Sequence, residues 1–159
     1  MKQLDLAALD TLSAQAKASP RLRANANLHD ELTDPIQRLA IAMEPDTVIR
    51  PHRHAHTWEL LTALRGRFIV LLFNGDGVVT ERVVLGKGCS VQETPAGVWH
   101  GVLSLDAGGV IFEVKRGPYT PINAADFAPG YASDDAEQGV ELNRWYAKAK
   151  AGDRLWGQG

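Results

Sequence analysis

Short, evenly spaced strand-like segments separated by glycine and proline turns constrain this chain more than any other feature. Residues alternate between apolar and polar, or run continuously apolar, over 22–29, 36–43, 48–54, 59–64, 68–73, 78–85, 89–94, 99–105 and 110–115. Asn74-Gly75-Asp76-Gly77 is the clearest hairpin turn among the connections. A series of short strands joined in this way predicts an all-β antiparallel sandwich or barrel.

Helical periodicity is confined to the two ends of the chain. Over residues 3–18, Leu4, Ala8 and Leu12 recur four apart, and Ser19-Pro20 ends the run. Residues 141–150 have weaker helical character. We therefore divide the chain into an N-terminal helix over 1–19, a barrel over 20–130 and a C-terminal extension over 131–159 that is either partly helical or disordered.

Composition excludes several classes of protein. The 159 residues carry a formal net charge of −2, which does not favour a nucleic-acid backbone or an anionic membrane as partner. The longest apolar run, over 68–73, is far too short to span a bilayer, and the acidic N-terminus does not have the pattern of a secretory signal. Since Cys89 is the single cysteine, a reducing compartment is expected, and we predict a cytoplasmic protein.

The stretch over residues 50–66, RPHRHAHTWELLTALRG, contains the side chains of a metal site. His52 and His54 lie two apart, so they project from the same face of a strand. Together with the carboxylate of Glu59 they make a ligand set for a divalent metal such as iron, manganese, nickel or zinc. His100, which follows a turn over 95–97, is a candidate fourth ligand.

The odd spacing between His54 and Glu59 requires a break in the strand. On one continuous strand the two side chains would point to opposite faces, and a turn over 55–57 removes this conflict. His56 would then lie in the turn, at the rim of the pocket, where it is a candidate acid or base. The alternatives for His56 are a metal ligand and a histidine exposed at the surface.

Two further side chains are expected to face the metal. Arg50 precedes His52 by two residues, so it would share the same face and could clamp a carboxylate or phosphate through two hydrogen bonds. The alternative partner for Arg50 is a buried carboxylate such as Glu113. Ser104 shares the face of His100 and would contribute a hydroxyl group to the pocket.

These residues resemble the two motifs of the cupin superfamily. His52-x-His54, Glu59 and Gly66 are similar to the first motif, and Pro95-x-Gly97-x-x-His100 is similar to the second. The resemblance implies a single cupin barrel, that is, a jelly roll or double-stranded β-helix. It also implies that His52, His54, Glu59 and His100 hold one divalent metal ion inside this barrel.

A narrower resemblance covers residues 20–130. The segments NANLH, DPIQR, RPHRH, WE and FEVKRGPY are similar to those of the cupin-fold metalloproteins called WbuC. That family is linked to surface-polysaccharide gene sets, which implies a sugar-derived ligand, while Arg50 as a clamp favours a carboxylate-bearing one. Asn27, His29, Gln37 and Tyr119 lie in matching segments and become pocket candidates. The chain departs from the family pattern at His56 and Gly130.

The sequence is compatible with several functions. One is a metal-dependent isomerase, epimerase or oxygenase acting on a small polar or anionic molecule, with His56 or Tyr119 as the acid or base. Another is a non-catalytic module that binds a sugar or an acid through the metal. A structural metal site and a barrel without metal are the remaining alternatives. A homodimer, formed through the N-terminal helix or an edge strand, is expected for any of them.

Overall fold

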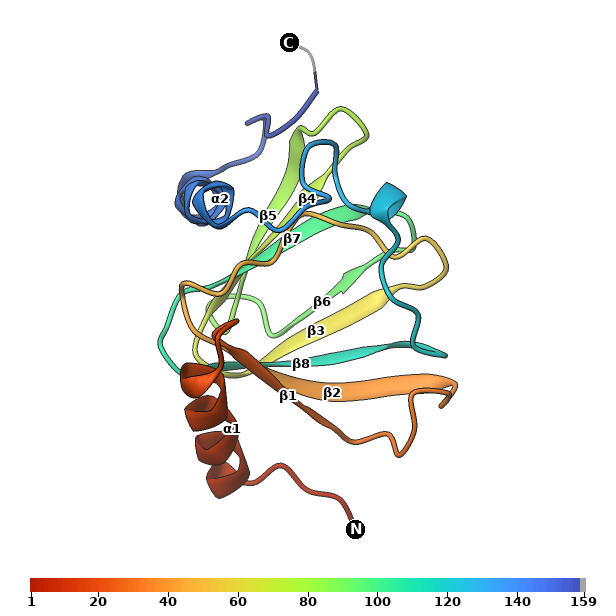
Figure 1. Ribbon diagram of the computed structural model, residues 1–159, viewed down its shortest axis with the longest axis vertical. Coiled ribbons are helices and arrows are strands. Elements are labelled where there is room, and N and C mark those ends of the chain that lie inside the picture. Colours follow the sequence, from red (N-terminus) through yellow and green to blue (C-terminus); the bar gives the residue numbers. More distant parts are fainter. Residues whose placement is uncertain (158–159) are drawn as a thin grey trace.

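The computed structural model describes residues 1–157 as two facing antiparallel sheets, with one helix against the outside of each (Figure 1). The larger sheet has the order β1-β2-β8-β3-β6 and the smaller has the order β5-β4-β7. The strands are β1 Arg23–Asn27, β2 Ile36–Met43, β3 Glu59–Arg65, β4 Phe68–Phe73, β5 Val79–Leu85, β6 Val91–Thr94, β7 Trp99–Ser104 and β8 Gly109–Arg116. This arrangement confirms the all-β jelly-roll barrel.

Apolar side chains pack against both faces of each sheet. Between the sheets, the buried cluster includes Phe68, Val70, Leu61 and Ile111. All six residues of β4 are buried, because one face of this strand meets the interior and the other meets a helix. A continuous apolar run is therefore expected for β4, in place of alternation.

The two helices cover the outer faces of the sheets. Helix α1, Leu6–Ala18, packs against the small side chains of Ala40 and Ala42 on the larger sheet. Helix α2, Ala136–Lys148, packs against the smaller sheet. It begins five residues before the weak periodicity at 141, because the Asp135 side chain caps it by accepting a hydrogen bond of 2.9 Å from the Gln138 amide. Both terminal helices are thus confirmed.

One predicted strand is wrong. Residues 48–54 do not form a ladder in the structure, and His52 alone makes isolated bridges, to His100 and to Phe127. Pro51 has no amide hydrogen to donate, which interrupts pairing at the residue before His52. The segment is nevertheless extended and buried around the histidines, so it still brings their side chains into the barrel.

The C-terminal extension is ordered against the barrel as far as it is described. Trp156 is 7% exposed and packs with Phe73 and Trp99. Residues 158 and 159 of the predicted extension lie outside the described part of the chain. No helix within residues 1–157 is both long and apolar enough to cross a membrane.

Candidate metal centre

Four side chains from three parts of the chain converge inside the barrel. His52 and His54 come from the extended segment before β3, Glu59 begins β3 and His100 lies on β7. All four are buried, and one ligand atom from each lies within 4.8 Å of the others. A divalent metal would need ligand atoms grouped in this way around one point.

Backbone hydrogen bonds hold the histidine segment in place. His52 and His100 exchange two amide-to-carbonyl bonds of 2.9 and 2.8 Å, which join the segment to β7. The Gly97 amide donates to the His54 carbonyl at 2.9 Å. A turn at residues 55–56 then separates His54 from β3, as the odd spacing requires. The two motifs, more than forty residues apart, are therefore locked together by their main chains.

The ring orientations suit metal binding. The Nδ1 atoms of His52 and His100 lie 2.8 and 3.1 Å from the carbonyls of Arg50 and Val98, respectively. An Nδ1–H donated to a carbonyl leaves Nε2 with its lone pair free for a metal. Nε2 of His100 is buried and makes no hydrogen bond within the described residues, although it lies 3.2 Å from Oε2 of Glu59. The donor set and this unsatisfied nitrogen fit a bound divalent cation.

The electrostatics of the metal-free site depend on burial and on Glu59. Burial, followed by the charge of His100, lowers the pKa of His52 well below its ordinary value, and burial also lowers the pKa of His54. Burial alone would raise the pKa of Glu59, but His100, His54 and Lys115 outweigh it, so that pKa lies well below normal. For His100, burial opposes the charged form, yet the Glu59 carboxylate raises the pKa overall.

We expect these opposite shifts to determine proton release on metal binding. His52 and His54 are already neutral at neutral pH, whereas His100 keeps its proton to a higher pH and must lose it to bind metal. Binding near neutral pH should therefore release up to about one proton and tighten as pH rises through the pKa of His100. Calorimetric titration in buffers of different ionisation enthalpy measures this number. Release of two or more protons would contradict the assignment of His100 as the one histidine that loses a proton on metal binding.

A cavity of about 550 Å³ is lined by three of the four candidate ligands, His52, His54 and Glu59, whereas His100 lies outside its lining. Its lining includes Glu113 and Lys115 on β8, and Lys115 Nζ lies 2.7 Å from Glu113 Oε1 and 3.8 Å from Glu59 Oε1. Burial, together with the charge of Glu59, raises the pKa of Glu113 to about 7. Sequence reasoning did not find Lys115. The signal was available, because Ile111, Glu113 and Lys115 alternate along one face of β8.

Arg50 lines the cavity but is held by the chain itself. Its guanidinium donates to the Ala132 carbonyl at 2.6 Å, lies 3.3 Å from Oδ1 of Asp134 and sits 4.0 Å from the centre of the Phe127 ring. Its carboxylate partner is therefore Asp134, whereas Glu113 pairs with Lys115.

Three predicted residues lie at or beyond the rim of the cavity. Tyr119 lines it and is 50% exposed. His56, in the turn after His54, is exposed and lies outside the lining residues, as is Asn27 at the end of β1. Asn25, two residues earlier on β1, is the asparagine that lines the cavity.

Three other predicted residues are buried away from the lining. His29 contacts the backbone of Arg38 through Nδ1 at 3.0 Å, and Ser104 donates to the Asp106 carbonyl at 3.1 Å. Gln37 donates to the carbonyls of Leu32 and Asp34 at 3.2 and 2.8 Å. In this structure, all three side chains stabilise turns.

Replacing Gln37 with alanine is accordingly expected to destabilise the fold and to leave the metal site intact. Loss of the buried amide leaves two turn carbonyls short of a donor, at a cost of about 1–3 kcal/mol. Gln15→Ala, on an exposed face of α1, is the matched control and should change stability by less than about 0.5 kcal/mol. Urea denaturation measures the free energy of unfolding, and elemental analysis measures the metal content. A loss of metal with unchanged stability would contradict the structural role of Gln37.

Comparison with known proteins agrees with this architecture. A family profile described as "Domain of unknown function (DUF6016)" matches residues 4–85, just over half of the chain. None of the curated proteins matches the sequence. Many solved structures share the fold, and three of them are described below.

KdgF from Halomonas sp. is 18% identical, with a TM-score of 0.51 over 64% of this chain and 84% of that one. TT1209 from Thermus thermophilus is 21% identical, with a TM-score of 0.53 over 73% of this chain and 95% of that one. The 11S allergen from Cocos nucifera is 16% identical, with a TM-score of 0.54 over 65% of this chain and 30% of that one. At these identities the likeness concerns the fold, which is a cupin jelly roll.

Proposed function

The chain belongs to the family described as Domain of unknown function (DUF6016), and from this premise and its cupin fold we propose a metal-dependent protein that acts on a small polar or anionic molecule. The observation that supports this most strongly is the convergence of three imidazoles and one carboxylate, of which His52, His54 and Glu59 line the cavity of about 550 Å³. That volume lies within the usual range for small-molecule sites.

In this proposal, His52, His54, Glu59 and His100 hold one divalent ion. When bound, the ion would supply Lewis-acid chemistry at a carbonyl or hydroxyl oxygen, or dioxygen chemistry if it is iron. The protein's own groups then bind and orient the ligand. Apolar residues of the cavity, such as Leu61 and Val102, exclude water from the reacting end.

The Glu113–Lys115 pair favours an enzyme over a purely binding module. Both side chains line the cavity beside Glu59, and burial raises the pKa of the Glu113 carboxyl group, so this group could exchange a proton with a bound molecule while Lys115 holds it in place. We therefore prefer an isomerase, an epimerase or an oxygenase. The alternative is a module that binds a sugar or an acid without turnover. In such a module, His56 and Tyr119 would not act as an acid or a base.

Finer assignments follow from the sequence resemblance and are proposals. We assign the protein to the WbuC type, with a sugar-derived ligand related to polysaccharide synthesis. The single Cys89 suits a reducing compartment such as the cytoplasm. We further propose a homodimer through α1 or an edge strand; light scattering at micromolar concentration tests this, and a monomer there would refute it.

The function is tested on protein loaded with Mn²⁺. Water proton relaxation is expected to show exchangeable water on the metal, and this signal should fall as a sugar acid, keto acid or sugar phosphate binds. Incubation of the same compounds in D₂O, followed by proton NMR, detects isomerase or epimerase activity as deuterium incorporation; an oxygen electrode detects oxygenation with Fe²⁺. Ligand binding without either reaction favours the binding module, and no effect of any compound refutes the proposal.

A further inference from the structure

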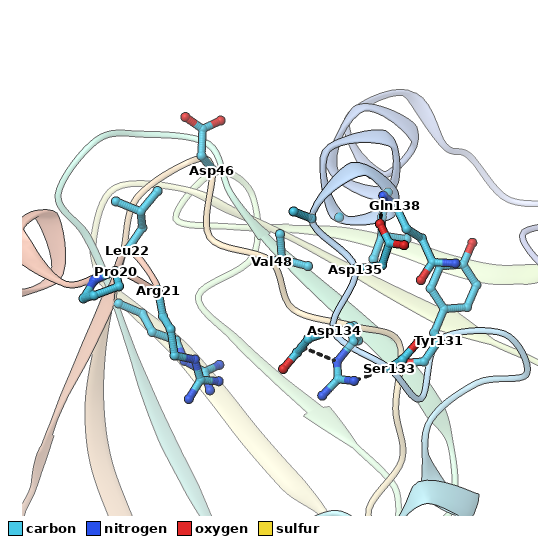
Figure 2. A pocket seen from close by; sticks show the side chains of 15 residues that line it. Pro20, Arg21, Leu22, Asp46, Val48, Tyr131, Ser133, Asp134, Asp135 and Gln138 are labelled. Carbon is cyan, nitrogen blue, oxygen red and sulfur yellow. Dashed lines mark hydrogen bonds and ion pairs between the residues drawn. The ribbon is translucent and has the colours of Figure 1, made fainter.

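A second cavity, of about 330 Å³ (Figure 2), adjoins the one lined by His52, His54 and Glu59. It lies between the start of β1, the segment before the histidines and the first turns of α2. The two cavities share five lining residues, which are Arg21, Arg23, Val48, Arg50 and Asp134. A ligand at the metal can therefore extend past a group of three arginines.

The three arginines differ in the hydrogen bonds and ion pairs that the protein makes to their guanidinium groups. Arg50 is held by the Ala132 carbonyl and by Asp134, as described above. The guanidinium groups of Arg21 and Arg23 make no hydrogen bond or ion pair among residues 1–157. Arg21 is exposed and Arg23 is partly buried. Two neighbouring cations at a cavity wall thus lack a direct hydrogen-bond or ion-pair partner among residues 1–157, although the carboxylates of Asp46, Asp134 and Asp135 line the same cavity.

Burial of Arg23 beside the like charge of Arg21 is electrostatically unfavourable. Burial and then the charge of Arg21 lower the pKa of Arg23, and the charge of Asp134 opposes this most strongly, followed by Tyr119 and Glu113. The Asp134 side chain is 92% exposed, so its attraction is weakened by solvent. Figure 2 shows Arg21 and Asp134 extending into the cavity from opposite sides. An anion held by Arg21 and Arg23, on the side of the cavity away from Asp134, would relieve the repulsion between these two arginines.

We propose that Arg21 and Arg23 form a subsite for a phosphate group, so that the substrate is a phosphorylated small molecule whose other end reaches the metal. This inference rests on the proposed function for the position of that other end. Planar guanidinium groups bind phosphate oxygens through paired hydrogen bonds, and two of them match a dianion in charge. A carboxylate would neutralise only one of the two cations.

The test measures the binding of inorganic phosphate to the metal-loaded protein by calorimetry. Arg21→Gln with Arg23→Gln is expected to weaken phosphate binding by about 10-fold or more, because charge-assisted hydrogen bonds are lost. The metal content should not change. The control is Arg82→Gln with Arg144→Gln, which removes the same charge from exposed positions outside both cavities and should alter binding by less than about 2-fold.

Two further measurements separate the subsite from the metal centre. The variant His52→Ala with His100→Ala should lose metal yet keep phosphate binding, since its arginines are intact. Acetate should bind the wild-type protein at least about 10-fold more weakly than phosphate, as expected for a site with two cations. Equal binding of acetate, undiminished binding in the Arg21/Arg23 variant or no phosphate binding by the wild type would overturn the subsite. None of these results would affect the metal proposal, which fails only if the wild type binds no metal.

Discussion

Replacing His52 and His100 with alanine is expected to abolish metal binding. The wild-type protein, purified without a histidine tag and reconstituted, should contain about one equivalent of divalent metal, as one four-ligand site requires. Substitutions in the shell around such ligands already cost 10- to 100-fold in affinity, so removing two ligands should cost more than about 100-fold. Elemental analysis measures the content, and the identity of the metal directs the choice of assay.

The control for this experiment is His56→Ala. His56 is exposed and lies outside the cavity lining, so this variant removes an imidazole from the same segment without touching the site. It should retain one equivalent of metal. Full metal content in the His52/His100 variant, or none in the wild type after reconstitution, would contradict the site as described.

Replacing Tyr146 with alanine is expected to cause the largest loss of stability among these variants. Tyr146 lies on α2, is fully buried and packs into the cluster that joins this helix to the smaller sheet. Its ring lies so close to Gly101 on β7 that a Cβ there would overlap it. Truncation of a buried aromatic side chain leaves a large cavity, at a cost of about 3–5 kcal/mol.

The control Tyr146→Phe keeps the ring and removes only the hydroxyl group, which donates to the Ile49 carbonyl at 3.3 Å. It should cost about 1 kcal/mol. Urea denaturation measures both free energies of unfolding. If the alanine variant lost less than about 1 kcal/mol, α2 would be an appendage of the barrel, and the smaller sheet would be stable without it.

The local sequence pattern of the C-terminal extension was insufficient to predict the bounds and the packing of α2. Its helical periodicity is weak over 141–150, yet α2 runs over Ala136–Lys148 and is firmly packed. The close fit of Tyr146 against Gly101 involves residues 45 positions apart in the sequence. Since tertiary packing supplies most of the stability of a short helix, sequence periodicity alone could not predict this one fully.

The sequence by itself predicted every strand except the one expected over 48–54, and it predicted the four side chains that converge as candidate metal ligands. Alternation and turn chemistry are local properties, and the spacing of His52, His54, Glu59 and His100 carries the ligand chemistry directly.

Only the tertiary structure decided what surrounds those ligands. Pairing of β3 with β8 brings Lys115 beside Glu59, and the packing of the segment before α2 places Arg21 and Arg23 at the same cavity as Asp134. The fold also directs the buried side chain of Gln37 to turn carbonyls. These neighbours follow from strand register and from the docking of α2, which bring together residues far apart in the chain. The physical reason is that the distance between such charges is set by long-range packing, which short-range sequence patterns do not encode.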